Sequence, residues 1–167
     1  MKEYGELLAG DRAWAARAHA FAARVRDVSE VMSDLGPPRA PRHPLHGTVV
    51  YHDACHLAHA QGVRAQPRDL LRAIPGLAIV SPAEPEVCCG SAGIYNLVQP
   101  EAASELGARK VAHISALQPD FVATGNPGCI IQIAATAARQ GHRWPVVHPI
   151  QLVDASIRGL TGPGLKT

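Results

Sequence analysis

Apolar residues recur at alternating steps of four and three along the first part of the chain. The residues that form this line are Trp14, Ala18, Phe21, Val25, Val28, Met32 and Leu35. Such spacing places them on one side of a helix. Asp11 can cap the start of that helix, and Gly36 followed by Pro37 and Pro38 ends it. The pattern predicts a helical arm over residues 1–36, whose apolar line packs either on the sheet of its own domain or on a neighbouring repeat.

A different pattern begins after a proline-rich segment. Residues 37–44 read PPRAPRHP, which cannot continue a helix, and we interpret residues 37–47 as a linker. Beyond it, short β-branched runs alternate with helical segments. Strands are predicted at 48–52, 77–80, 121–124 and 146–147, and helices at 67–74, from Pro100 onward, at 129–139 and at 150–157. This alternation predicts an α/β domain over residues 48–160, with a four-stranded, mostly parallel sheet flanked by helices, and a disordered tail at 161–167.

The composition is that of an ordinary globular protein and narrows the function classes. The chain has 167 residues, 47% of them hydrophobic and 18% charged, with a formal net charge of +2. Its arginines are scattered and aromatic residues make up only 4%, which argues against a nucleic-acid surface. No apolar run is long enough to span a membrane, and the start lacks a signal pattern. We therefore expect a cytoplasmic protein, or one held at the inner face of the cell membrane through a partner.

Four cysteines carry the candidate chemistry. In a reducing compartment they are more often metal ligands or catalytic groups than disulfides, and the adjacent Cys88 and Cys89 make a poor disulfide. Cys55 follows the first predicted strand, the Cys88–Cys89 pair follows the second, and Cys129 follows the third. The carboxyl ends of parallel strands share one edge of the sheet. Three loops are therefore expected to bring all four thiols together at that edge.

The spacing of the cysteines bears on which metal they would hold. Zinc usually takes two ligands from a close Cys-x-x-Cys pair, which is absent here. Adjacent cysteines point in different directions and suit a multi-iron cluster, and four thiolates are the usual complement of a 4Fe-4S cluster. Backbone at Gly90, Ser91, Gly93 and Gly128 can approach the sulfurs closely and leave N–H groups to bond them. The residues alone leave an iron–sulfur cluster, zinc and free thiols as alternatives.

The cysteine pattern also resembles a known family. Cys55, the Cys88-Cys89-Gly90 triplet and Cys129 resemble the cysteine-rich CCG domain of heterodisulfide reductase and its relatives. Within that superfamily, three stretches resemble the C-terminal repeat of the glycolate oxidase iron–sulfur subunit: YHDACHLAHAQGVRAQPRDLL (51–71), CCGSAGIYNLVQPEAA (88–103) and ATGNPGCIIQI (123–133). KEYGELL near the start resembles the segment between the two CCG repeats of that family.

The resemblance implies an electron-transfer subunit. Subunits of this family work beside flavin-containing partners that oxidise glycolate to glyoxylate, and they relay the electrons toward a membrane quinone. By resemblance, Cys55, Cys88, Cys89 and Cys129 ligate a 4Fe-4S cluster, FAD lies on the partner subunits, and this chain has no catalytic residue. The full-length subunit also carries a ferredoxin-like region and a first CCG repeat. On this interpretation the chain is truncated at its N-terminus, and the apolar line of the arm faces the missing regions.

One departure from the pattern concerns the ligands. The heterodisulfide reductase motif ends in Cys-x-x-Cys, whereas Gln132 stands three residues after Cys129 here. One thiolate of that enzyme's non-cubane cluster is thus absent, which makes a thiol–disulfide reductase the weaker of two alternatives. The other is a non-redox assembly domain with zinc or free thiols. Candidates for an additional ligand, or for groups that surround the ligands, are His52, His56, His59, Asp53 and Gln132.

Overall fold

The computed structural model describes residues 1–36 and 41–160 of the chain. It divides into two units, Met1–Gly36 and Pro37–Thr167. The first unit contains helices, and the second holds the sheet and all four cysteines. The predicted tail at 161–167 and residues 37–40 of the predicted linker lie outside the described residues.

The first unit contains three short helices rather than the single helix that the apolar line suggested. They are α1 (Tyr4–Leu7), α2 (Ala15–Ala22) and α3 (Val28–Asp34). Asp11 does bond the backbone just before α2, where its Oδ1 accepts hydrogen bonds from the N–H groups of Ala13 and Trp14. Helix α2 ends at Ala22, and the extended backbone of Asp27 begins α3 through a capping box with Glu30. A local cap therefore outweighs the continuous periodicity.

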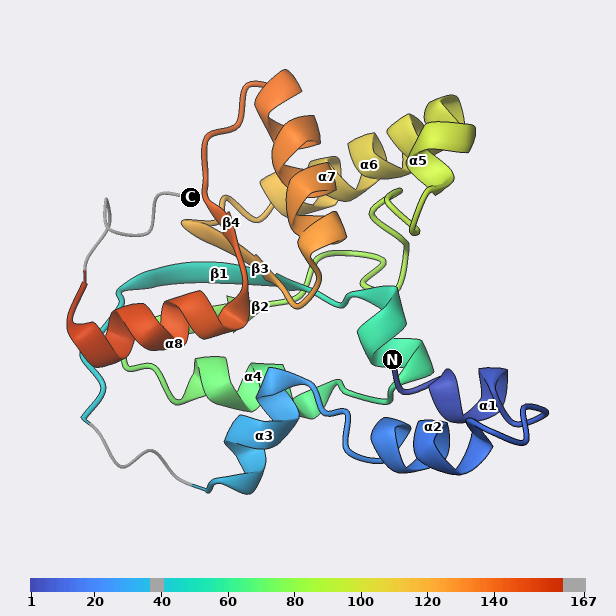
Figure 1. Cartoon of the computed structure of the whole chain (residues 1–167). Coiled ribbons are helices and arrows are strands. Elements are labelled where there is room, and N and C mark those ends of the chain that lie inside the picture. Colours follow the sequence, from blue (N-terminus) through green and yellow to red (C-terminus); the bar gives the residue numbers. More distant parts are fainter. Residues whose placement is uncertain (37–40, 161–167) are drawn as a thin grey trace. The chain divides into compact units, whose positions relative to one another are not determined.

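The second unit is built on four parallel strands in the order β2-β1-β3-β4 (Figure 1). The strands are β1 (Gly47–His52), β2 (Leu77–Val80), β3 (Phe121–Thr124) and β4 (Val146–Val147). β1 pairs with β2 from Gly47 opposite Leu77, and with β3 from Val49 opposite Phe121. The predicted α/β fold with a parallel sheet is confirmed. Because β1 and β3 are the inner strands, the loops that follow them leave the sheet side by side.

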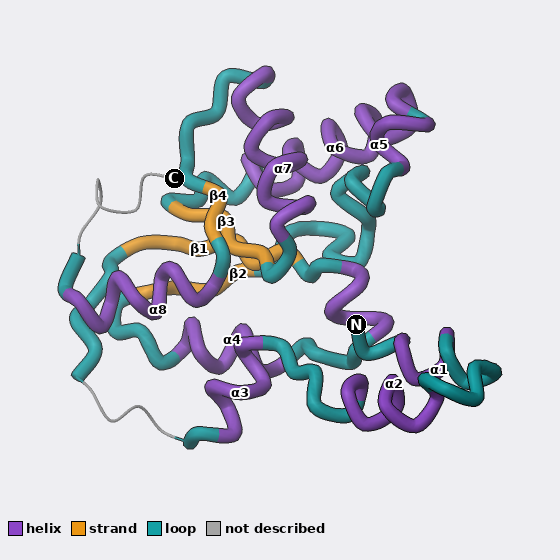
Figure 2. Tube along the Cα trace, viewed as in Figure 1, coloured by secondary structure: helices purple, strands orange, loops and turns teal. Residues whose placement is uncertain are grey.

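Along the chain, the helices of the second unit come between successive strands and after the last strand; Figure 2 shows them in purple. They are the π-helix η1 (His56–Ala60), α4 (Ala65–Arg72), α5 (Tyr95–Val98), α6 (Pro100–Ser115), α7 (Pro127–Arg139) and α8 (Pro149–Arg158). Proline begins α6, α7 and α8, because its fixed φ suits the first helical position. The short helices η1 and α5 were not predicted. No helix in the described ranges is long and apolar enough to cross a membrane.

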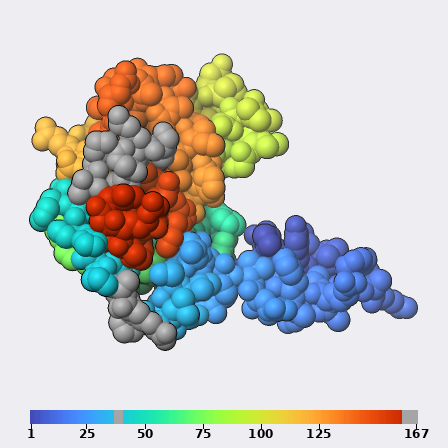
Figure 3. All heavy atoms as spheres, turned by 60° about the vertical axis from the view of Figure 1, so that its left-hand side comes forward, coloured from blue at the N-terminus to red at the C-terminus, as the bar shows by residue number. Residues whose placement is uncertain are grey.

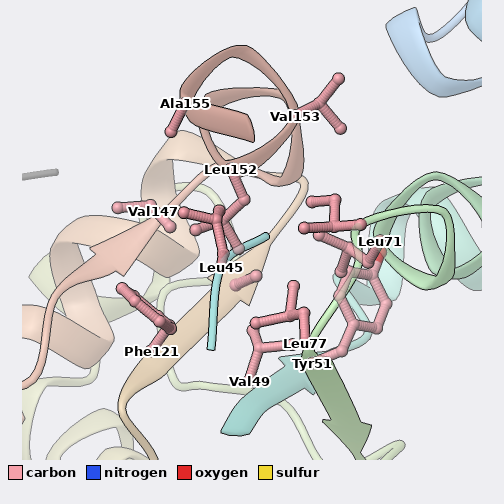
Figure 4. Close-up of a cluster of buried hydrophobic side chains, with 12 residues drawn as sticks. Leu45, Val49, Tyr51, Leu71, Leu77, Phe121, Val147, Leu152, Val153 and Ala155 are labelled. Atoms are coloured by element: carbon pink, nitrogen blue, oxygen red, sulfur yellow. The ribbon is translucent and has the colours of Figure 1, made fainter. Parts of the chain in front are cut away.

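Helices cover both faces of the sheet, with α4 and α8 on one face and α6 and α7 on the other (Figure 1). Side chains alternate along β1, so Val49 and Tyr51 pack with Leu71 of α4 and Leu152 of α8 (Figure 4). Val50 points the other way, into the core formed with α6 and α7. Full burial of each such aliphatic side chain stabilises the fold by about 1.5–3 kcal/mol.

The chain that enters β1 is tied to the end of α8. The N–H of His43 donates to the carbonyl oxygen of Ser156 at 2.8 Å, and the Ser156 hydroxyl donates back to the His43 carbonyl at 2.7 Å. Figure 3 shows α8, in red, on the surface beside the segment that leads into β1. This anchor fixes where β1 begins, and with it the place where the chain leaves β1 toward Cys55.

Candidate metal centre

The four thiols lie on the three loops that follow β1, β2 and β3. Cys55 is the residue before η1, Cys88 and Cys89 lie between β2 and α5, and Cys129 lies in the first turn of α7. The Cys88 thiol interacts with the thiols of Cys55 and Cys89, and the Cys89 thiol interacts with that of Cys129. All four cysteines are free. These pairwise interactions run through all four predicted cysteines in the order Cys55, Cys88, Cys89 and Cys129, which we call the line of sulfurs.

The line of sulfurs runs from the protein interior to the surface. Cys89 and Cys129 are buried, whereas Cys55 and Cys88 are partly exposed. The adjacent residues Cys88 and Cys89 therefore serve different sides of the centre. A metal group held here would have an inner side from which water is excluded and an outer side near solvent.

Without a metal, the thiols of Cys55, Cys88 and Cys89 hold their protons firmly. The Cys89 thiol, together with burial, raises the pKa of Cys88 far above its usual range. The Cys129 thiol outweighs the opposing effect of Cys88 and, with burial, raises the pKa of Cys89 to about 11. Burial and then the charge of Cys88 also raise the pKa of Cys55. Because metals bind the thiolate form, metal binding at this centre would release protons.

His52, the last residue of β1, lies against the inner end of the line. One of its ring nitrogens and the Sγ atoms of Cys89 and Cys129 all lie within 4.8 Å of one another. The side chain is 1% exposed, and its Nδ1 has no hydrogen-bond partner among the described residues. Burial, and secondarily the charge of Lys110, lowers the pKa of His52 to about 4. The imidazole is therefore neutral at physiological pH, the form in which it can bind a metal.

The other predicted polar residues already have partners. The Nε2 of His56 lies 2.8 Å from the Gln61 side-chain nitrogen, and the Nδ1 of His59 lies 3.0 Å from the Arg64 guanidinium. Both histidines are exposed. Asp53 accepts two hydrogen bonds from the Arg68 guanidinium, at 2.7 and 2.5 Å. Gln132 accepts one from the side-chain amide of Asn96 at 3.4 Å. The structure thus separates these four candidates from His52.

The small residues of the Cys88–Cys89 loop allow close backbone packing. Gly90 has a φ of +92°, and a Cβ at this position would lie 2.3 Å from the carbonyl oxygen of Ala103 in α6. Its N–H points to the Cys88 Sγ at 3.4 Å, the kind of backbone contact predicted for a metal-bound sulfur. A Cβ on Gly128 would lie 2.8 Å from the buried Ser91 hydroxyl, so these two loops also touch. Gly93 has a φ of +67°, and a Cβ at this position would have open space around it.

Residues on one face of α6 pack against the Cys88–Cys89 loop. The most polar of these residues, Lys110, was not identified from the sequence. Gly107 lets the helix approach the carbonyl oxygen of Cys89. A Cβ on Gly107 would lie 3.4 Å from that oxygen. One turn later, Lys110 is fully buried and donates to the carbonyl oxygen of Glu84 at 2.7 Å. The sequence does contain a signal for this buried face, because four residues recur at steps of four, three and four: Ala103, Gly107, Lys110 and Ile114. A lysine in such a stripe is normally expected to be solvent-exposed.

The donor atoms fit a metal group of a definite kind. Four thiols and a neutral imidazole are soft or intermediate ligands, which suit iron–sulfur clusters, iron or zinc rather than magnesium or calcium. The cysteine cluster is consistent with metal or iron–sulfur binding. Residues 49–134 match the family described as CCG, Cysteine-rich domain. The chain belongs to the CCG cysteine-rich domain family. This match covers η1, the Cys88–Cys89 loop and the start of α7, and so every thiol of the centre.

This CCG domain is similar to several curated proteins, one of which is named as an iron-sulfur subunit. It is 32% identical over 149 residues to the uncharacterized protein YkgE of Escherichia coli, covering 89% of this chain and 62% of that protein. It is 35% identical over 144 residues to the probable glycolate oxidase iron-sulfur subunit of Bacillus subtilis, covering 84% and 32%. It is 28% identical over 155 residues to lactate utilization protein A of Geobacillus kaustophilus, covering 93% and 65%. The CCG domain chain thus spans less than two thirds of each of these relatives.

Proposed function

We propose that this CCG domain holds an iron–sulfur cluster on Cys55, Cys88, Cys89 and Cys129 and transfers electrons within a complex that oxidises a 2-hydroxy acid. The observation that carries the proposal is the continuous line of four thiols drawn from three loops. Four thiolates are the usual ligand set of a 4Fe-4S cluster. The names of two relatives, an iron-sulfur subunit of a probable glycolate oxidase and a lactate utilization protein, support a 2-hydroxy acid substrate. Glycolate is the specific substrate that we propose.

A cluster bound here would supply one-electron transfer, and the chain would supply its surroundings. Hydride removal from the 2-hydroxy acid belongs to a flavin on a partner subunit, from which electrons pass through this domain toward a quinone. The partly exposed Cys88 side gives the electrons a short route from the surface. The Gly90 N–H directed at the Cys88 Sγ stabilises negative charge on that sulfur. The buried Cys89 and Cys129 keep the inner side free of water.

Metal analysis of the full chain tests the proposal. After purification without oxygen, or reconstitution with iron and sulfide, we expect about four irons and four sulfides per chain. The visible absorption of the cluster should disappear in Cys88→Ser. His59→Ala is a matched control, because His59 is exposed, lies in the same region and bonds Arg64 instead of a sulfur. A chain that binds no iron under these conditions would overturn the proposal.

The substrate is tested separately, with the flavin-containing partner subunits present. Adding glycolate should bleach the cluster absorption only in the presence of those partners. Glycolate added to this chain alone should leave the cluster oxidised, since no hydride acceptor is proposed on it. Bleaching by lactate but not by glycolate would retain the electron-transfer role and replace the substrate.

A zinc-holding assembly domain is the second candidate, favoured by one specific observation. The donor atoms of His52, Cys89 and Cys129 lie within 4.8 Å of one another, a spacing close to that around a single tetrahedral ion. The same metal analysis distinguishes the two functions. One zinc per chain with little iron would favour the assembly domain, and anaerobic loading with iron and sulfide that displaces zinc would favour the cluster.

A further inference from the structure

We propose that His52 binds the metal centre directly, as a nitrogen ligand beside Cys89 and Cys129. This inference rests on the proposed metal-binding function and adds a ligand to it. The CCG pattern in this chain has Gln132 where the related motif has a final cysteine, so a further ligand must come from elsewhere if the centre has one. The geometry points to His52.

The position of His52 follows from the alternation along β1. Val50, two residues earlier, points into the core formed with α6 and α7, and His52 points to the same side. That side is where the Cys129 helix and the Cys89 loop pack. The His52 ring is therefore held by a strand of the sheet rather than by a mobile loop, a rigid placement that metal ligands require.

The distances suit coordination. Metal–nitrogen and metal–sulfur bonds measure about 2.0 and 2.3 Å, so donor atoms around one tetrahedral ion lie about 3.5–3.8 Å apart. The three donor atoms of His52, Cys89 and Cys129 already lie within 4.8 Å of one another. A shift of about 1 Å in these atoms would bring all three to the separations of one coordination sphere. That ion would be either one iron of the cluster or a single zinc.

The unpartnered nitrogen of His52 is a second, independent observation. Nδ1 is buried and has no hydrogen-bond partner among the described residues. Leaving a buried polar atom in this state is unfavourable, and most such atoms in proteins have a partner. If Nδ1 binds the metal, this atom gains a partner, and the free-energy cost of burying it without one is removed.

The alternatives to His52 already have side-chain partners. His56 and His59 are exposed and lie against Gln61 and Arg64 respectively. The Gln132 oxygen accepts a hydrogen bond from Asn96. Within the described residues, the one group of three or more potential ligands found close together consists of His52, Cys89 and Cys129.

Pulsed electron paramagnetic resonance tests the inference on the intact chain, reconstituted with iron and sulfide and then reduced. A directly bound histidine gives a nitrogen hyperfine coupling, which should change to that of nitrogen-15 when only histidine is labelled. We expect the coupling in the wild type and in His56→Ala, and its loss in His52→Ala. If His52→Ala fails to fold, persistence of the coupling in both His56→Ala and His59→Ala supports His52. A cluster that forms without any histidine coupling would overturn the inference.

Failure of the proposed cluster is a separate outcome with its own measurement. If the wild type takes up no iron, the chain is loaded with cobalt(II), whose visible bands report the number and type of ligands. A change of those bands in His52→Ala, but not in His56→Ala, supports ligation by His52 at a single-ion site. Identical bands in the wild type and in His52→Ala overturn it.

Discussion

The ammonium group of Lys110 donates a hydrogen bond to the carbonyl oxygen of Glu84 at 2.7 Å, and the lysine side chain is fully buried. Burial lowers the pKa of Lys110, against the opposing effect of Cys89, Glu84 and Cys88. This contact anchors α6 to the loop that carries two of the four thiols. A positive charge is thereby fixed close to the candidate centre.

Removing that charge should make the proposed cluster harder to reduce. Reduction adds negative charge, which Lys110 stabilises, so Lys110→Met should lower the midpoint potential in a redox titration. Its free energy of unfolding should fall by about 1–3 kcal/mol, because backbone carbonyls of the loop lose their donor. Arg109→Met is the matched control, since it removes a neighbouring but exposed charge that pairs with the Glu84 carboxylate. An unchanged potential in Lys110→Met would limit Lys110 to an anchoring role.

The two glycines of the Cys88–Cys89 loop should respond very differently to a methyl group. Gly90→Ala places a Cβ 2.3 Å from the Ala103 carbonyl oxygen at a φ of +92°. We expect it to destabilise the fold by about 2 kcal/mol or more and to impair metal uptake. Gly93→Ala has a φ of +67° but open space, so only the backbone strain of about 1–2 kcal/mol applies. Urea unfolding of both variants measures the difference, and equal losses would show that the contact with α6 has no energetic weight.

Most of the fold could be predicted from the sequence, because the strands of the sheet follow local patterns of apolar and β-branched residues. Short β-branched runs at 77–80, 121–124 and 146–147 coincide with the observed strands, and Pro100 marks the start of α6. The helical arm was predicted as one helix because its periodicity is continuous. Asp27 breaks it through a side-chain bond that competes with that periodicity, and such competition is decided only by the folded geometry.

The candidate site was predictable in part for a similar reason. The convergence of Cys55, Cys88, Cys89 and Cys129 follows from strand topology alone. Sequence could not separate His52 from His56, since both lie within three residues of Cys55. The distinction depends on where β1 ends and η1 begins, which buries one ring and exposes the other. Lys110 was missed because its burial requires the loop after β2 to fold over α6.

The ion pair between Arg68 of α4 and Asp53 should stabilise the fold far more than an exposed ion pair on the same helix. Arg68 holds Asp53 through two hydrogen bonds and lies over the Tyr51 ring, 4.6 Å from its centre. Asp53 and Arg68 side chains are only 8% and 18% exposed. Asp53→Asn leaves a partly buried guanidinium without its counter-charge, so we expect a loss of about 3 kcal/mol in unfolding free energy.

The same substitution at an exposed pair provides the comparison for Asp53. Asp69 pairs with Arg72 on the same helix, and both side chains are more than 60% exposed. Asp69→Asn should leave the unfolding curve unchanged within error, because solvent screens such pairs. Similar curves for the two variants would contradict a structural role for the Asp53–Arg68 pair.

The start of α3 should be sensitive to acid through Glu30. Burial alone raises the pKa of this carboxyl, but hydrogen bonds from Lys2 and from the Asp27 N–H, both at 2.7 Å, lower the pKa below its usual value of 4.5. A carboxyl whose pKa is lower in the folded state stabilises that state above its unfolded pKa. That contribution is lost as the pH falls through the folded pKa. We therefore expect helicity at Val28–Asp34 to decrease in acid below the range where an exposed glutamate titrates. Carbon-13 chemical shifts of the Glu30 carboxyl measure its titration directly. Lys2→Met should move the titration of Glu30 to higher pH. A Glu30 that titrates near 4.5 in both proteins would contradict the assigned role of Lys2.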